Sequence, residues 1–191
     1  VWLELRPEDL NRPFFLSPKI KTGIGENFFF GGLMSFDDGA VEFRRIHNQL
    51  QLVWLNTEYV ARAGTPEARA VEAAFSPSLL AGTAVLSLPH PERKSILIEA
   101  NAIFVTDLLG TAMQLQRSYR QGYAFDARNS AITAVRNTPD VTVIEVSSHF
   151  ATGSIAVAQA GSPAGSPVPT VPRALPDARS LFMTMHYSLA R

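Results

Sequence analysis

The chain of 191 residues contains no cysteine. That absence excludes disulfide bonds, thiolate zinc sites and cysteine nucleophiles. A surplus of charge is also missing, because 17 acidic residues balance 17 basic ones. Since proteins that bind nucleic acid carry a basic surplus or stripe, we expect no nucleic-acid partner. The nearest approach to a basic patch, residues 117–121, is typical of a solvated helix end.

Long hydrophobic runs are absent too. No segment approaches the roughly 20 apolar residues that cross a bilayer as a helix, so we expect no membrane span. The chain starts at Val1 in a strand-like segment, residues 1–5, without a methionine or a signal peptide. This start indicates a piece of a longer or processed protein. Hydrophobic residues, at 46%, suffice for one core, so we expect a single domain over residues 1–191.

Recognisable catalytic motifs are the third absence. The glycine-rich run 23–32 lacks the Gly-Lys-Ser/Thr ending of a phosphate-binding loop, so it predicts a loop or bulge. The acidic pair 37–38 is typical of a hairpin turn and lacks the ligand repeat of a calcium loop. Ser76, Ser78 and Ser87 have no GxSxG context. None of these segments predicts a catalytic site.

The four histidines form no HxxxH or HExxH pair, so the sequence shows no local zinc ligand set. His149 and His186 lie in strand-like segments and could approach each other across paired strands, although single histidines on a sheet face are commoner. Asp107 and Asp126 stand as isolated carboxylates. We therefore expect no catalytic residue, no metal ligand and no cofactor in this chain. The remaining histidines are His47 and His90.

What the sequence does contain is period-two alternation of apolar and polar residues, which predicts half-buried strands. Three hairpins are predicted in this way: 41–44 with 50–55, 84–88 with 95–99, and 131–135 with 141–150. The last strand, 181–189, alternates most regularly. Its odd positions are expected to share a face of the sheet: Leu181, Met183, Met185, Tyr187 and Leu189.

The clearest helix signal covers residues 66–75. Thr65 is a favourable N-cap, Pro66 fits the first helical position, and Pro77 ends the helix. We expect its apolar face to pack on the sheet: Ala68, Val71 and Phe75. A second helical region, 105–120, is weakened at its glycine and is expected to form two short pieces.

Roughly nine or ten strands and two or three short helices, without regular βαβ alternation, predict an α+β domain that is mainly antiparallel β. Residues 158–172, rich in Gly, Ser, Pro and Ala, predict a flexible surface loop. Consecutive phenylalanines cannot all point inward from one strand. We therefore expect an interaction surface at Phe28, Phe29 and Phe30.

Short motifs follow one another along nearly the whole chain. They are 14–17 (FFLS) leading to 23–25 (GIG), 41–45 (VEFRR), 56–61 (NTEYVA), 69–80 (RAVEAAFSPSLL), 104–107 (FVTD), 123–126 (YAFD), 129–132 (NSAI), 136–137 (RN), 176–180 (PDARS) and 186–189 (HYSL). In this order they resemble the domain of unknown function near the N-terminus of large bacterial zinc-dependent metalloproteases.

The resemblance implies a parent protease that is exported to the periplasm or cell envelope. Its extended HExxH motif and its zinc would lie downstream, outside this chain. The chain itself is then expected to be a non-catalytic accessory domain that packs on or assists the downstream protease domain of the same polypeptide. An independent peptide- or ligand-binding β module of an exported protein is the alternative, ahead of a stand-alone enzyme.

Overall fold

The computed structural model describes residues 1–32, 36–158 and 168–191. Within these ranges the chain forms ten β-strands, three short α-helices and two 3-10 helices, which confirms the predicted mainly antiparallel α+β class. The strands are β1 (Trp2–Leu5), β2 (Pro13–Thr22), β3 (Gly39–Ile46), β4 (Gln49–Trp54), β5 (Ser78–Ala84), β6 (Ile96–Glu99), β7 (Ala124–Phe125), β8 (Ala131–Asn137), β9 (Val141–Ala151) and β10 (Ser180–Ala190). The helices are η1 (Pro7–Asp9), α1 (Pro66–Ala74), α2 (Asn101–Phe104), α3 (Thr111–Tyr119) and η2 (Ala127–Asn129).

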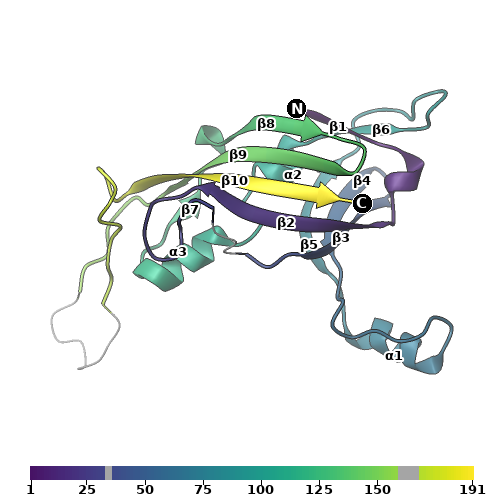
Figure 1. Cartoon of the computed structure of the whole chain (residues 1–191), viewed down its shortest axis with the longest axis horizontal. Helices are drawn as coiled ribbons and strands as arrows, with labels where there is room; N and C mark the ends of the chain where they lie inside the picture. Colours follow the sequence, from purple (N-terminus) through teal and green to yellow (C-terminus); the bar gives the residue numbers. More distant parts are fainter. Residues whose placement is uncertain (33–35, 159–167) are drawn as a thin grey trace.

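One eight-stranded sheet dominates the molecule. Its order is β5-β4-β3-β2-β10-β9-β7, and β8 also pairs with β9, beside the short β7. β10 lies in the middle and pairs along its whole length with β9, so the long strands lie side by side in Figure 1. The predicted hairpins β3–β4 and β8–β9 are confirmed by their registers.

The core lies on the face of the sheet to which the odd positions of β10 contribute. Leu181, Met183, Met185, Tyr187 and Leu189 are all buried, as their alternation predicted. Helix α2 covers this face: its Phe104 is fully buried, with its ring centroid 5.8 Å from that of Tyr187. The opposite, outer face of β9 and β10 is therefore where polar side chains of these strands gather.

The predicted pairing of 84–88 with 95–99 is present only in part, as an antiparallel bridge between Val85 and Ile98. Next to it the Leu86 N–H donates to the Leu97 carbonyl at 3.1 Å, and Ser87 Oγ accepts from the Leu97 N–H at 2.9 Å. The regular strand partner of β6 is β1, in a separate two-stranded sheet whose register joins Leu5 to Ile96. β1 supplies backbone partners and the buried Leu5, whereas prolines at 89 and 91 interrupt the segment that follows β5.

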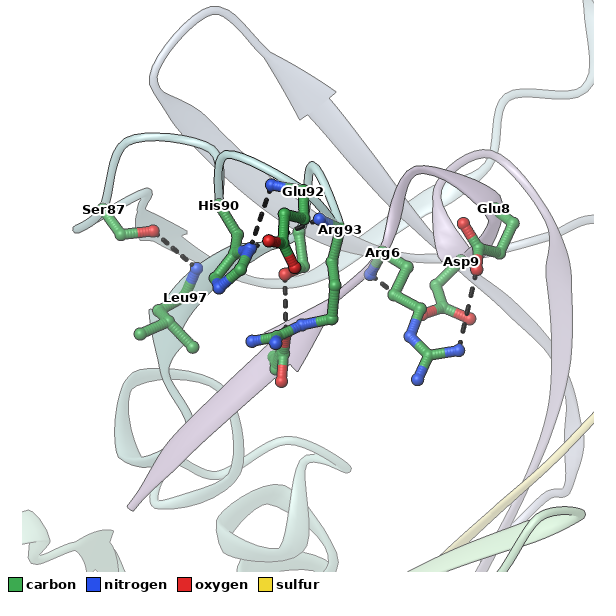
Figure 2. A network of polar contacts seen from close by, with 10 residues as sticks. Arg6, Glu8, Asp9, Ser87, His90, Glu92, Arg93 and Leu97 are labelled. Atoms are coloured by element: carbon green, nitrogen blue, oxygen red, sulfur yellow. Dashed lines mark hydrogen bonds and ion pairs between the residues drawn. The ribbon is translucent and has the colours of Figure 1, made fainter.

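The turn between these segments is held by its own polar groups (Figure 2). His90 Nδ1 accepts from the backbone N–H groups of Glu92 and Arg93 at 3.2 and 3.3 Å. Arg93 Nε in turn donates to the Glu4 carboxylate on β1 at 2.9 Å. His90 thus stabilises a turn that is tied to the first strand, which accounts for one of the four histidines.

Helix α1 departs from its predicted place. It begins as expected, with Thr65 Oγ1 accepting from the Ala68 N–H at 3.2 Å. None of its residues is buried, and Figure 1 shows it well away from the sheet, so the prediction that it packs on the sheet is wrong. The reason is topological: β4 and β5 pair directly, and the helix lies in the long connection between them. We call residues 55–77 the α1 arm.

Of the predicted helical region 105–120 only one helix forms, α3, which begins directly after Gly110, whose φ is +68°. The prediction of two pieces within that region is therefore wrong, since the short helix α2 lies before it, at Asn101–Phe104. Asp107, which the sequence left isolated, accepts from the N–H groups of Thr111 and Ala112 at 2.6 and 3.0 Å. Its carboxylate therefore caps the start of α3.

The glycine-rich run forms the loop that the sequence predicted. Its backbone N–H groups at Ile24 and Gly25 both donate to the Phe29 carbonyl, so they are engaged within the loop and do not point at a phosphate site. The predicted loop at 158–172 falls largely on residues 159–167, which lie outside the described residues; residue 158 and residues 168–172 form neither helix nor strand.

Candidate functional site

The predicted phenylalanine surface is only partly present. Phe28 and Phe30 are 80% and 42% exposed, but Phe29 is 2% exposed and belongs to the core. The cause is a tight turn, in which the Phe29 N–H donates to the Glu26 carbonyl while Phe28 adopts a φ of +70°. The expectation for Phe29 is therefore wrong, and the candidate surface keeps the two flanking rings.

The α1 arm carries a second apolar surface. The rings of Tyr59 and Phe75 stack in parallel, with centroids 3.9 Å apart. Beside them lies a groove of about 360 Å³, whose apolar lining includes Tyr59, Val60, Ala68, Val71, Phe75 and Pro77. The apolar face that the sequence predicted for this helix therefore exists, but it lines a groove instead of the core.

An acidic pocket lies next to that groove. It has a volume of about 540 Å³, and Asp37, Asp38 and Glu58 line it together with Trp54. Residues 55–57 line both the pocket and the groove, so the two are continuous along the base of the arm. A partner that fills both would present apolar side chains next to a positive charge.

A second polar site lies on the outer face of the main sheet. His149 Nδ1 lies 2.9 Å from Asp126 Oδ2, and His149 Nε2 lies 2.7 Å from Ser180 Oγ. The three residues come from three adjacent strands: Asp126 follows β7, His149 is on β9, and Ser180 starts β10. The two ring nitrogens thus join a carboxylate on one side to a hydroxyl on the other.

Local structure holds this Asp–His–Ser cluster in place. Asp126 caps η2 by accepting from the Arg128 N–H at 3.1 Å, and its Oδ2 also accepts from Asn129 Nδ2 at 2.6 Å. The bonds from Asn129 and then His149 lower the pKa of the Asp126 carboxyl below its ordinary value. The ring of Phe182 packs on the His149 ring, with the two ring centroids 4.5 Å apart. The imidazole is therefore fixed in orientation, and the carboxylate beside it is ionised at neutral pH.

The strand register decides which histidines meet. It places His149 opposite Phe182 and His186 opposite Glu145, four positions further along β10. The prospect that His149 and His186 approach each other is therefore wrong, and Asp126 is not an isolated carboxylate. Ser180 was missed altogether, because nothing in the residues around it has the form of a nucleophile motif. Only the pairing of β7, β9 and β10 brings the three side chains together.

Glu145 forms a separate buried centre on the same outer face. Lys21 Nζ lies 2.6 Å from its Oε2, and Arg136 and His186 each have a nitrogen 3.5 Å from its Oε1. The hydrogen bond from Lys21, with the surrounding positive charge, lowers the pKa of the Glu145 carboxyl. Ion pairs of the Glu145 carboxylate therefore link β9 to β2, through Lys21, and to β8, through Arg136.

This lowered pKa predicts that the protein loses stability in acid. The ionised Glu145 stabilises the folded state above the pKa of the unfolded chain, about 4.3, and the contribution is lost as pH falls through the lower folded pKa. We expect the free energy of unfolding in urea to fall less steeply from about pH 5 to pH 3 for Glu145→Gln than for the wild type. Part of the dependence of the unfolding free energy on pH should remain in Glu145→Gln, because the pKa of the Asp126 carboxyl is lowered in the same way.

The matched control is Glu99→Gln on β6, an exposed position, which should retain the wild-type slope. Equal acid slopes for Glu145→Gln and the wild type would contradict the assignment.

Among residues 1–32, 36–158 and 168–191, no group of three or more His, Asp or Glu side chains is placed to hold a metal ion. No helix in the same ranges is long and apolar enough to cross a membrane, in line with the expectation from the sequence. Comparison of the chain with models of protein families, with curated proteins and with solved structures finds no match.

Proposed function

We propose that this chain is an accessory domain of an exported zinc-dependent metalloprotease, and that its α1 arm docks on the protease domain that follows in the same polypeptide. Zinc and peptidase activity would belong to that domain, in the periplasm or cell envelope. The proposal joins the ordered motifs, which resemble the N-terminal domain of such proteases, to one structural observation: α1 carries an apolar face, yet none of its residues is buried within the described part of the chain.

The energetics of α1 support a docking role. The helix has nine residues and buries none of them. Isolated helices shorter than about 12–15 residues are marginal in water, because most helical stability in proteins comes from packing of an apolar face. The Thr65 cap and the Tyr59–Phe75 stack support the helix locally. A partner that covers Ala68, Val71 and Phe75 would supply the packing that the sheet does not.

The surroundings of the arm indicate what the partner surface contains. The groove takes apolar side chains, and the adjoining pocket carries the carboxylates of Asp37, Asp38 and Glu58. Charge complementarity favours a lysine or arginine there. We therefore infer that the protease domain presents an apolar ridge flanked by a basic side chain to the arm.

The test measures binding between this chain and the downstream protease region, produced as separate polypeptides. Val71→Lys places a charge on the apolar face of α1 and should weaken binding at least about tenfold, because the charge would have to be desolvated. Ala73→Lys introduces the same residue on the opposite side of the same helix and should leave the dissociation constant unchanged. Isothermal titration calorimetry gives both constants.

Absence of binding, or equal effects of the two lysine variants, would overturn docking through this face. A second candidate, an independent peptide-binding module, is favoured by the acidic pocket around Trp54. Saturable binding of a lysine-containing peptide that Asp38→Asn abolishes, together with no binding of the protease region, would establish that candidate instead.

A further inference from the structure

We propose that Asp126, His149 and Ser180 form an acyl-transfer site that hydrolyses carboxylic esters, with Ser180 as the nucleophile. This activity goes beyond the docking role and would belong to this chain alone. It also departs from the expectation that the chain carries no catalytic residue. The proposal rests on the geometry of the outer face of the sheet and does not depend on the α1 arm.

The three contacts follow the roles that a serine hydrolase requires. Ser180 Oγ lies 2.7 Å from His149 Nε2, within reach for transfer of its proton. Asp126 Oδ2 lies 2.9 Å from the other ring nitrogen, Nδ1. That bond selects the tautomer with the proton on Nδ1 and leaves Nε2 free to accept from the serine. Such constellations are recognised by geometry and roles, since their order in sequence differs between folds.

Sheet register explains why the three side chains meet, with Asp126 beside His149 and Ser180 diagonally across from it. Phe125 on β7 is paired with Phe150 on β9, and Ala151 on β9 is paired with Ser180 on β10. The Asp126 N–H donates to the His149 carbonyl at 2.9 Å, which extends the β7 pairing by one residue. Because the positions are set by backbone hydrogen bonds, the side chains are organised before any ligand binds.

A second serine–histidine–carboxylate row on the same face provides an internal comparison. His186 Nε2 lies 3.1 Å from Ser188 Oγ, and His186 Nδ1 lies 3.5 Å from Glu145 Oε1. The latter distance is too long for a good hydrogen bond, and Glu145 is already bonded to Lys21 at 2.6 Å. His186 therefore lacks a carboxylate dedicated to its orientation, so we assign the activity to Ser180 and not to Ser188.

The side chains next to the site indicate the substrate class. Phe182 lies two positions along β10 from the nucleophile, packs on His149, and is 54% exposed. An exposed ring beside the serine offers a stacking surface for an aromatic group. Ser180 itself is partly exposed, whereas His149 is only 8% exposed. We therefore infer small aryl esters as substrates, and we expect slow turnover because the base is largely buried.

The chemistry balances without a cofactor. Ser180 Oγ bonds to the ester carbonyl carbon while its proton passes to His149 Nε2. The carbon–oxygen bond to the leaving group breaks, and His149 returns the proton to the departing alcohol. Water then attacks the acyl-serine, losing a proton to His149, and Ser180 leaves with that proton restored. One ester and one water give one acid and one alcohol. Asp126 acts as a positioning residue that holds His149 throughout.

The experiment exposes the chain to a fluorophosphonate probe, which bonds to an activated serine oxygen with release of fluoride, and to 4-nitrophenyl acetate. We expect a single phosphonylated residue, Ser180, by peptide mass spectrometry. Labelling of the folded chain should be at least about 100-fold faster than that of the urea-unfolded chain, and Ser180→Ala should abolish labelling. Asp126→Asn should slow both labelling and ester hydrolysis at least about tenfold.

Ser188→Ala is the matched control and should keep wild-type labelling and hydrolysis. It removes the serine of the second row, whose histidine lacks a carboxylate dedicated to its orientation. Thermal unfolding of each variant checks that the fold persists, and the adduct on Ser180 is a readout that a purely structural cluster would not produce. Absence of an adduct on the folded wild type, or labelling of Ser188 in place of Ser180, would overturn the proposal.

Discussion

Replacing Phe104 by alanine is expected to lower the free energy of unfolding by about 3–5 kcal/mol. Phe104 is the last residue of α2, is fully buried, and contacts the ring of Tyr187 on the central strand β10. Its removal takes away a large transfer free energy and leaves a cavity between the helix and the sheet, which rigid strands cannot fill by moving. Urea titration followed by tryptophan fluorescence measures the change.

Phe15→Ala supplies the control for this first prediction. Phe15 lies on β2 and is about half exposed, so its replacement by alanine should lower the free energy of unfolding by less than about 1.5 kcal/mol. If both variants lose equal stability, α2 does not anchor the core in the way that its burial indicates.

The second large effect is expected for Gln121→Leu, which should lower the free energy of unfolding by about 2–4 kcal/mol. Gln121 is completely buried, and its amide makes three hydrogen bonds to the backbone. Its Nε2 donates to the carbonyls of Ala156 and Thr170, both at 3.0 Å, and its Oε1 accepts from the Ala156 N–H at 2.8 Å. Leucine has a similar size but leaves these three backbone groups without their partner. The loss of unfolding free energy therefore comes mainly from buried polar groups that are left unpaired.

Gln116→Leu on α3 is the comparison, because Gln116 is exposed and the substitution should change stability by no more than about 0.5 kcal/mol. Chemical denaturation of both variants under identical conditions measures the difference. A cost for Gln121→Leu below that of Gln116→Leu would mean that the buried amide does not hold the two segments together.

The two proposed sites lie on different parts of the fold and rest on different physics. The α1 arm leaves the main sheet at its β4–β5 end and offers an apolar groove beside an acidic pocket. The Asp–His–Ser cluster lies across β7, β9 and β10. Because the two share no residue, the lysine variants of α1 should not change fluorophosphonate labelling, and Ser180→Ala should not change docking. Failure of one proposal therefore leaves the other standing.

Local signals in the sequence were reliable where few neighbouring residues decide the structure. The hairpins β3–β4 and β8–β9 followed from alternation on both sides of a turn, and the buried face of β10 followed from its odd positions. The cap at Thr65 also depends only on adjacent residues. For the phenylalanine run the same logic failed, because a turn with positive φ at Phe28 sends Phe29 into the core.

The sequence by itself determined the class of this protein, two of its local hairpins and where α1 begins, since capping, proline and alternation act over a few residues. Only the tertiary structure decided that β6 pairs with β1, that the apolar face of α1 lines a groove off the sheet, and that Asp126, His149 and Ser180 meet. His149 lies 23 and 31 residues from its two partners in sequence, so their contact depends on the register between strands. Backbone hydrogen bonds and core packing across the whole sheet set that register, and no short motif encodes it.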